Sequence, residues 1–209
     1  MQNEDSMLTF KQVFQTITRP GAAELWDYLK TGSFFEDPAS TRYHMDCCGG
    51  LCRHSLNVYY RLKKLVEDYG RESGRSYSDE SVAIVALLHD LCKMGCYQQT
   101  VRNQKTYDPD KVAEAPGYMV KKDSMGSFIW QSVMSYTFED PFPYGHGEKS
   151  VYLIRKFMEL SDEEAMAIRY HMGLWNEGEQ RNAGKVFETN PLAFFLHIAD
   201  EYATYIDET

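Results

Sequence analysis

Histidine and aspartate residues occur in this chain beside apolar runs, where charged side chains are uncommon. His89 and Asp90 follow the run Ile84-Val-Ala-Leu-Leu, and Asp200 ends a second apolar run that begins at Leu192. A buried carboxylate costs several kcal/mol unless it is paired or binds a metal. Imidazole nitrogen and carboxylate oxygen together suit Mn, Fe, Co, Ni or Zn. The two acids therefore indicate a shared divalent cation.

Each of these residues also has an ordinary structural interpretation. A single histidine on a helix more often packs in the core than binds a metal. Asp90 could pair with Lys93 or Arg53, and Asp200 could pair with a lysine elsewhere. The metal interpretation depends on the joint occurrence of these residues with His54, in order, on helices separated by loops.

Apolar spacing predicts the helices that would carry these residues. Spacings of three and four predict an amphipathic helix over residues 51–69. Ser78 or Asp79 can begin the next helix, which is apolar on most sides and runs to about Lys93. His89 and Asp90 would lie about 100° apart on it and border one cavity. Further helices are predicted over 22–30, from after Gly147 to about Met158, over 162–172, and over 191–205, whereas 173–189 is expected to be a loop.

Residues 97–144 differ from the rest of the chain because they are rich in Tyr, Thr, Gly and Pro. Gly117–Lys122 and Ser127–Tyr136 have the pattern of extended strands, and Asp123–Gly126 could turn the chain between them. We therefore predict a mainly α fold with a β-hairpin-like insertion around 97–144.

Composition limits the class of protein and of partner. The chain has 209 residues, 43% of them hydrophobic and 25% charged, as in soluble globular proteins of one domain. Its formal net charge of −9 argues against non-specific nucleic-acid binding. A small phosphorylated substrate stays possible, because bound metal ions can reverse the sign of a local site. There is no apolar run of about 18 residues to span a membrane and no apolar signal core near Met1, so we expect a cytoplasmic protein without membrane contact.

The cysteines offer a different metal site. Cys48 and Cys52, and likewise Cys92 and Cys96, are four residues apart and could together form a four-thiolate zinc site. Structural zinc sites favour tighter spacings such as Cys-x-x-Cys. We favour Cys92 and Cys96 as small core residues.

The ordered set of histidines and aspartates resembles the HD-domain metal-dependent phosphohydrolase superfamily. That family has a His, then a His-Asp pair, then a later Asp, all on helices. The resemblance implies a helical bundle, here one HD-type domain over 1–209. It also implies a first metal held by His54, His89, Asp90 and Asp200.

Two further histidines extend the resemblance. Many family members hold a second metal with two extra histidines, and His146 and His171 stand at the corresponding points. Asp90 would then bridge the two ions. One or two divalent ions per chain are expected, with Mg as a further candidate. The Gly49-Gly-Leu-x-x-His opening resembles in particular the HD domain of bacterial 3′→5′ exoribonucleases, although the nucleic-acid-binding module usual in that subgroup is not visible here.

The resemblance implies a metal-dependent phosphohydrolase that cleaves a phosphate ester of a nucleotide or short oligonucleotide. A metal-bound water acidified toward neutral pH would be the nucleophile. Asp90 and Lys93 are the candidate catalytic residues. Lys93, Arg53 and His44 are the candidates for phosphate or substrate contact, although Lys93 could equally stabilise a helix C-terminus. The alternative function is a non-catalytic regulatory module that binds metal and nucleotide.

Overall fold

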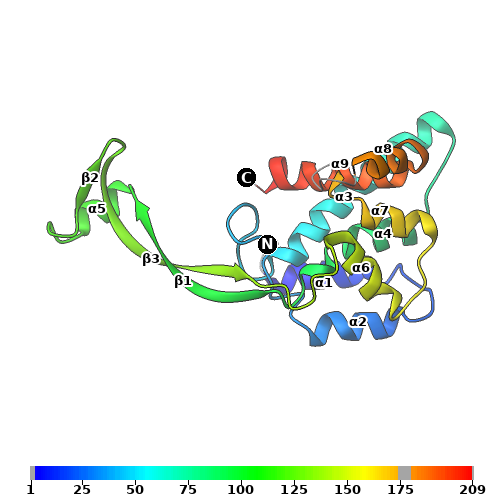
Figure 1. Cartoon of the computed structure of the whole chain (residues 1–209), viewed down its shortest axis with the longest axis horizontal. Helices are drawn as coiled ribbons and strands as arrows, with labels where there is room; N and C mark the ends of the chain where they lie inside the picture. The colour runs from blue at the N-terminus through cyan, green and yellow to red at the C-terminus, as the bar shows by residue number, and fades with distance from the viewer. Residues whose placement is uncertain (1–2, 174–179, 209) are drawn as a thin grey trace.

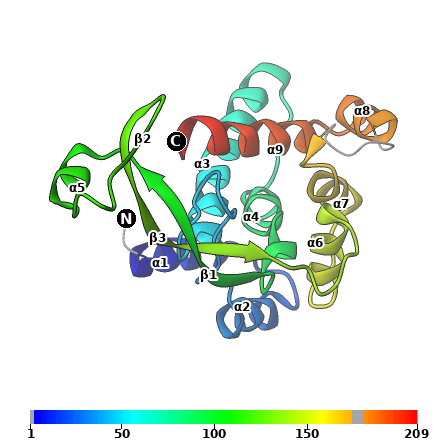
Figure 2. The same ribbon diagram turned by 60° about the vertical axis from the view of Figure 1, so that its left-hand side comes forward.

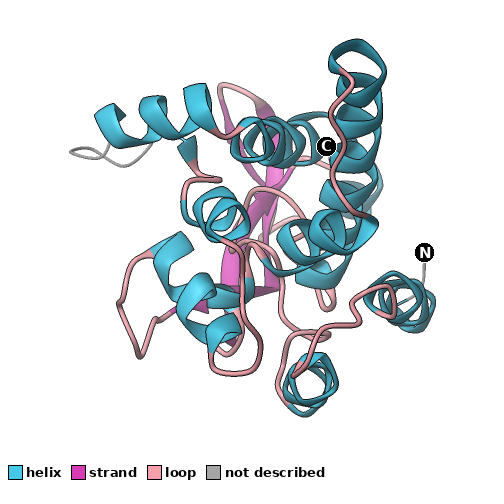
Figure 3. Ribbon diagram, turned by 90° about the vertical axis from the view of Figure 1, so that its right-hand side faces the viewer, coloured by secondary structure: helices cyan, strands magenta, loops and turns pink. Residues whose placement is uncertain are grey.

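The computed structural model describes residues 3–173 and 180–208. The helices form a body from which a narrow β-sheet projects (Figure 1). Viewed along the long axis, the helices lie in front and the strands behind them (Figure 3). The helices are α1 (Asn3–Phe14), α2 (Ala22–Thr31), α3 (Gly50–Ser73), α4 (Asp79–Leu88), α5 (Pro109–Glu114), α6 (His146–Arg155), α7 (Asp162–Arg169), α8 (Gln180–Thr189) and α9 (Pro191–Tyr202), and the strands are β1 (Tyr97–Thr106), β2 (Lys121–Asp123) and β3 (Gly126–Phe138). The mainly α fold with a small hairpin insertion is thus confirmed.

Helix α4 is the centre of the body. Every residue from Val82 to Leu88 is buried, as its apolar sequence on all sides predicts. Ser78 caps the helix, because its hydroxyl accepts from the backbone N–H of Ser81 at 3.0 Å. The long helix α3 packs against both α4 and α9, and α9 crosses it (Figure 2). This packing brings the apolar runs near His89 and Asp200 together.

The prediction that the central helix continues to Lys93 was wrong in its last turn. Helix α4 ends at Leu88, and a 3-10 turn covers Leu91–Lys93. Asp90 lies between them with φ −101° and ψ 17°. The backbone N–H of Cys92 donates instead to the hydroxyl of Ser150 on α6, at 3.0 Å. This hydrogen bond satisfies the backbone N–H of Cys92, which has no helical carbonyl partner because α4 has already ended.

The first helix, α1, was not predicted, and it packs through aromatic side chains. The Phe10 ring centre lies 5.3 Å from the ring centres of both Phe34 and Phe35. Arg19, which follows α1, makes an ion pair with Glu164 at 2.8 Å. Glu164 also completes the capping box of α7 with Ser161, so one carboxylate joins the N-terminal segment to α7.

Strands β1 and β3 form most of the projecting sheet, which we call the arm (residues 97–138). They pair antiparallel from Tyr97↔Phe138 to Thr106↔Ile129. The short strand β2 pairs with β3 around the expected turn. The main pairing therefore joins β1 to β3, and 117–120 is a turn, not a strand, with Met119 N–H donating to Pro116 O at 2.8 Å. Figures 1 and 2 show α5 and β2 at the far end of the arm.

The C-terminal part follows the capping signals in the sequence. The side chain of Asn190 accepts from Ala193 N–H, and Pro191 stands at the first position of α9, as expected. The segment 180–189 is helix α8 and not the predicted loop, while 174–179 lie outside the described residues. No helix of the described chain is long and apolar enough to cross a membrane.

Candidate metal centre

Four histidines and two aspartates meet inside the helical body. All are buried except His146, which is half-buried. They come from separate elements: His54 from α3, His89 and Asp90 from the turn after α4, His146 from the first residue of α6, His171 from the turn after α7, and Asp200 from α9. These are the six residues that the sequence pattern placed in a metal centre.

The first group of donor atoms surrounds Nε2 of His54. This atom lies 3.1 Å from Oδ1 of Asp200 and 3.3 Å from Nε2 of His89. It also lies 3.6 Å from Oδ2 of Asp90. Two imidazole nitrogens and two carboxylate oxygens therefore converge on one point. This donor set fits a divalent transition metal.

The second group of donor atoms surrounds Oδ1 of Asp90, the carboxylate oxygen that does not face His54. Oδ1 is 2.8 Å from Nε2 of His146 and 3.5 Å from Nε2 of His171. Oδ2 instead faces His54 and His89, at 3.6 and 3.5 Å. The carboxylate of Asp90 thus separates two pairs of histidines, one for each oxygen.

Hydrogen bonds behind the histidines fix which ring nitrogen faces the centre. Nδ1 of His89 donates to the carbonyl of Ala86 at 2.8 Å, and Nδ1 of His171 donates to the carbonyl of Ile168 at 2.6 Å. A carbonyl only accepts, so a neutral ring keeps the lone pair of Nε2 toward the centre. Nε2 of His171 is buried, and no hydrogen bond within the described chain satisfies it. A metal ion would satisfy it, so the residues present fit the ion.

Glycines on both sides of His146 allow α6 to begin close to α7. A Cβ at Gly147 would lie 2.3 Å from the carbonyl oxygen of Arg169, so only glycine fits. Gly145 has φ 99°, a conformation that L-residues with side chains rarely adopt. Sγ of Cys92 lies 3.4 Å from Nδ1 of His146. The close approach of α6 to α7 brings His146 next to His171, which lies in the turn after α7.

Burial and charge set opposite protonation states for two of the histidines. Burial lowers the pKa of His89 to about 4, although Asp90 and Asp200 oppose this shift. His89 is therefore neutral at neutral pH, as a metal ligand must be. Burial would also lower the pKa of His54, but hydrogen bonds with Asp200 and Glu208 outweigh it and raise the pKa to about 10. A bound cation would have to replace the proton on Nε2 of His54.

Lys93 places a positively charged amine beside Asp90. Nζ lies 2.7 Å from Oδ2 of Asp90 and donates to the carbonyl of Ala39 at 3.0 Å. Burial would lower the pKa of Lys93, but Asp90 outweighs that effect and the pKa is raised. Burial similarly opposes ionisation of Asp90, yet Lys93 and the histidines hold its pKa well below the usual range. Both groups are charged at neutral pH.

A cavity of about 270 Å³ opens onto this centre. Asp90, Lys93, Asp200 and His44 are among the residues that line it. Both ring nitrogens of His44 are buried without a hydrogen-bond partner in the described chain. The other lining residues are Tyr43, Met172, Glu201, Thr204 and Tyr205.

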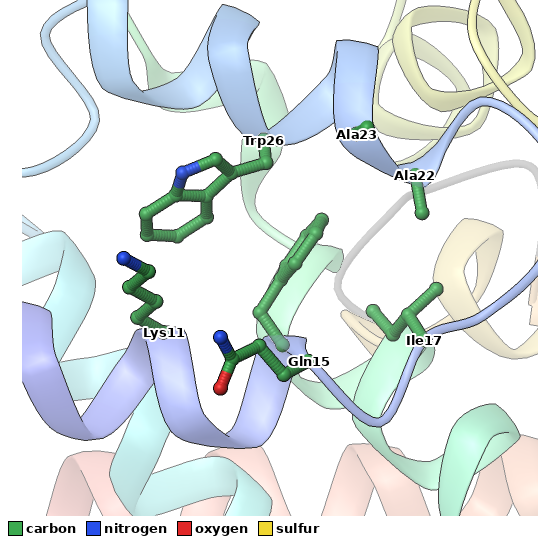
Figure 4. A pocket seen from close by; sticks show the side chains of 7 residues that line it. Lys11, Gln15, Ile17, Ala22, Ala23 and Trp26 are labelled. Carbon is green, nitrogen blue, oxygen red and sulfur yellow. The ribbon is translucent and has the colours of Figure 1, made fainter.

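A groove of the same volume lies between α1 and α2, so size alone does not identify the functional cavity. Lys11, Gln15, Trp26 and other side chains line that groove (Figure 4). None of its lining residues is a histidine, cysteine or carboxylate. The chemistry of the side chains therefore favours the cavity beside Asp90.

Arg53 is not among the described residues that line this cavity. Its guanidinium donates to Sγ of Cys47 at 2.6 Å. Among the described residues, no group of side chains that could hold a metal contains two cysteines. Cys92 is the one cysteine that belongs to such a group, together with Asp90 and His146. The four-thiolate zinc alternative is therefore wrong.

Two contacts of the centre were not part of the predicted site. Glu208 places its carboxylate 3.1 Å from Nδ1 of His54, although 154 positions separate them in the chain. Nδ1 of His197 donates to the carbonyl of His171 at 2.7 Å and so steadies the backbone of that residue. Neither contact follows from local spacing, because each depends on how two distant segments pack.

A comparison with protein families agrees with this arrangement. The family model for the HD domain matches residues 51–205, a range that includes all six residues of the centre. No curated protein and no solved structure matches the chain. Proteins of this family are generally metal-dependent hydrolases, and the buried His and Asp groups described above could hold such metals. The match covers most of the chain, and the chain belongs to the HD-domain family.

Proposed function

We propose that this protein is a phosphohydrolase that cleaves a phosphate ester of a nucleotide or short oligonucleotide. It would hold two divalent ions, one with His54, His89, Asp90 and Asp200, the other with Asp90, His146 and His171. When bound, the ions would acidify a water molecule and neutralise charge on the phosphoryl group.

The division of the Asp90 carboxylate is the observation that carries this proposal. Oδ2 lies 3.6 Å from Nε2 of His54, and Oδ1 lies 2.8 Å from Nε2 of His146. A purely structural aspartate would need one partner, such as Lys93. Asp90 instead has histidines near both oxygens, and this geometry supports a carboxylate shared between two cations.

The residues at the cavity wall support binding of a phosphate group. Lys93 places a protonated amine beside Asp90, where a phosphoryl oxygen would approach the centre. His44 could donate a ring N–H to the same group, because its ring nitrogens make no hydrogen bond within the described chain and the nearest carboxylate oxygen, Oε2 of Glu208, lies 4.0 Å from Nε2. Both residues would orient the ester and stabilise negative charge that develops during cleavage.

The size and rim of the cavity favour a small substrate. A volume of about 270 Å³ is at the lower end for ligand pockets, which span roughly 300–1,000 Å³. Tyr43 and Tyr205 line the cavity and are 90% and 60% exposed. Such rings can stack on a nucleobase. The net charge of −9 further disfavours long nucleic acids.

A substrate screen with metal replacement tests the proposal. Protein freed of metal is loaded with Mn, Fe, Co, Ni, Zn or Mg and tested with nucleoside monophosphates, dinucleotides and short oligonucleotides. We expect release of phosphate or nucleotide by the wild type and at least a hundredfold less by Asp90→Asn, since the bridging carboxylate is lost. Glu67→Gln, which removes an exposed charge on α3, serves as the matched control. Tight metal and nucleotide binding without turnover would instead favour the regulatory alternative.

A further inference from the structure

Nδ1 of His54 has a carboxylate partner that lies outside the six-residue centre. Oε1 and Oε2 of Glu208 lie 3.1 and 3.2 Å from this nitrogen. The side chains of Glu208 and His54 are 0% and 1% exposed. A carboxylate removed from water in this way needs donors that hold it.

Neighbouring groups provide the donors that hold Glu208. Nδ2 of Asn57, one turn after His54 on α3, donates to Oε1 of Glu208 at 2.9 Å. The preceding residue, Asp207, accepts from Nε of Arg61 at 2.7 Å. The guanidinium of Arg61 also lies 4.1 Å from the ring centre of Tyr202. Side chains of α3 thus fix the short π-helix Ala203–Asp207 that follows α9.

One segment therefore contacts both ring nitrogens of His54. Asp200, on α9, lies 3.1 Å from Nε2, and Glu208, just after the following π-helix, lies 3.1 Å from Nδ1. An imidazole that donates its Nε2 lone pair to a metal must carry its proton on Nδ1. A carboxylate on Nδ1 selects this tautomer and fixes the plane of the ring.

We propose that Glu208 is a positioning residue of the metal centre, which orients His54 and increases the ability of its Nε2 atom to bind metal. The inference rests on the metal centre of the proposed function. His89 and His171 use backbone carbonyls for the same purpose. Among these three histidines, only His54 has a charged carboxylate as the partner of its Nδ1 atom. Metal binding by His54 is therefore expected to depend more on a side chain than metal binding by the other two.

Metal affinity tests the inference without any substrate. Mn²⁺ and Zn²⁺ are titrated into the metal-free protein of residues 1–209, and binding is followed by calorimetry and by competition with a chelator. We expect Glu208→Ala to weaken affinity about 10- to 100-fold. Glu208→Gln, which keeps an acceptor oxygen, should weaken it less. Glu67→Gln, an equal change of charge on the exposed face of α3, should stay within twofold.

The tautomer provides a second readout, in Zn²⁺-loaded protein. Long-range ¹H–¹⁵N spectra should place the proton of His54 on Nδ1 in the wild type, with the proton shifted downfield by its hydrogen bond. In Glu208→Ala that shift should be lost. Unfolding midpoints of the metal-free variants show whether any loss arises from misfolding, and the Gln variant keeps the test valid if the Ala variant does not fold.

The outcomes separate this inference from the proposed function. A wild type that binds neither ion would overturn both the metal centre and the role of Glu208. A wild type that binds metal, with a folded Glu208→Ala variant of equal affinity and an unchanged Nδ1 proton, would overturn the role of Glu208 alone.

Discussion

Nζ of Lys93 lies 2.7 Å from Oδ2 of Asp90. The ammonium group of Lys93 therefore forms an ion pair with the carboxylate that lies between the two pairs of histidines. The 3-10 turn after Asp90 brings the two side chains together, since the backbone N–H of Lys93 donates to the carbonyl of Asp90 at 2.9 Å. A lysine placed in this way can contact a phosphoryl group without holding the metals itself.

Lys93→Gln should therefore reduce turnover and leave metal content unchanged. We expect kcat/KM to fall by about 10²- to 10³-fold, the usual effect of losing one group that stabilises developing charge. Steady-state kinetics on the best substrate and elemental analysis of the same samples measure both quantities. Lys64→Gln, on the exposed side of α3, is the matched control. Loss of metal in Lys93→Gln would show that the lysine acts on the centre itself.

Removing the second pair of histidines should remove one ion. The wild type is expected to hold about two divalent ions per chain, and the double variant His146→Ala/His171→Ala about one, since His54, His89 and Asp200 still surround the other position. Elemental analysis after gel filtration gives the ratio. His146→Ala alone, at a half-buried position, shows the effect without disturbing the core. Retention of two ions by the double variant would contradict this assignment.

The ion pair between Arg19 and Glu164 should stabilise the fold above acidic pH. Burial would raise the pKa of Glu164, but hydrogen bonds, first that from Arg19, outweigh it and lower the pKa. Stability from such a group is present above its unfolded pKa of about 4.3 and is lost as pH falls through the lower folded value. Arg19→Met should cost about 3 kcal/mol at pH 7, because it leaves a buried carboxylate unpaired.

Urea unfolding at several pH values checks this sign. The difference in unfolding free energy between wild type and Arg19→Met should be constant from pH 7 to about pH 5 and should shrink below about pH 4. Lys30→Met, which removes an exposed ion pair with Asp27, should change stability little at any pH. A difference for Arg19→Met that grows on acidification would reject the role of Glu164.

The arm should be dispensable for folding of the body. In the described chain, the buried hydrophobic core of the body includes no residue between 97 and 138. Replacing residues 99–136 with Asn-Gly would join Gln98 to Thr137, which face each other in the register, through a two-residue turn. The unfolding midpoint should move by less than about 4 °C, and metal content should not change. Insoluble or metal-free protein would show that the arm supports the centre.

Some features of the fold were determined locally and could be predicted. The apolar sequence of α4 required burial on all sides. Ser161 and Asn190 marked helix starts through bonds to residues three positions away, and Pro191 did so by standing at the first position of α9. The pairing of β1 with β3 could not be predicted in the same way. Its register joins residues up to 41 positions apart, such as Tyr97 and Phe138, and no turn signal connects them directly.

The candidate residues of the centre could be predicted from the sequence alone, because aspartates in apolar surroundings are tolerable only with a cation or an ion-pair partner, and the order of His54, His89, Asp90 and Asp200 is that of the family. Their relative geometry depends on tertiary packing. The end of α4 at Leu88 turned Asp90 so that its two oxygens face different histidines. The packing of the segment after α9 against α3 brought Glu208 to His54. Both results depend on contacts between distant segments, which local spacing does not encode.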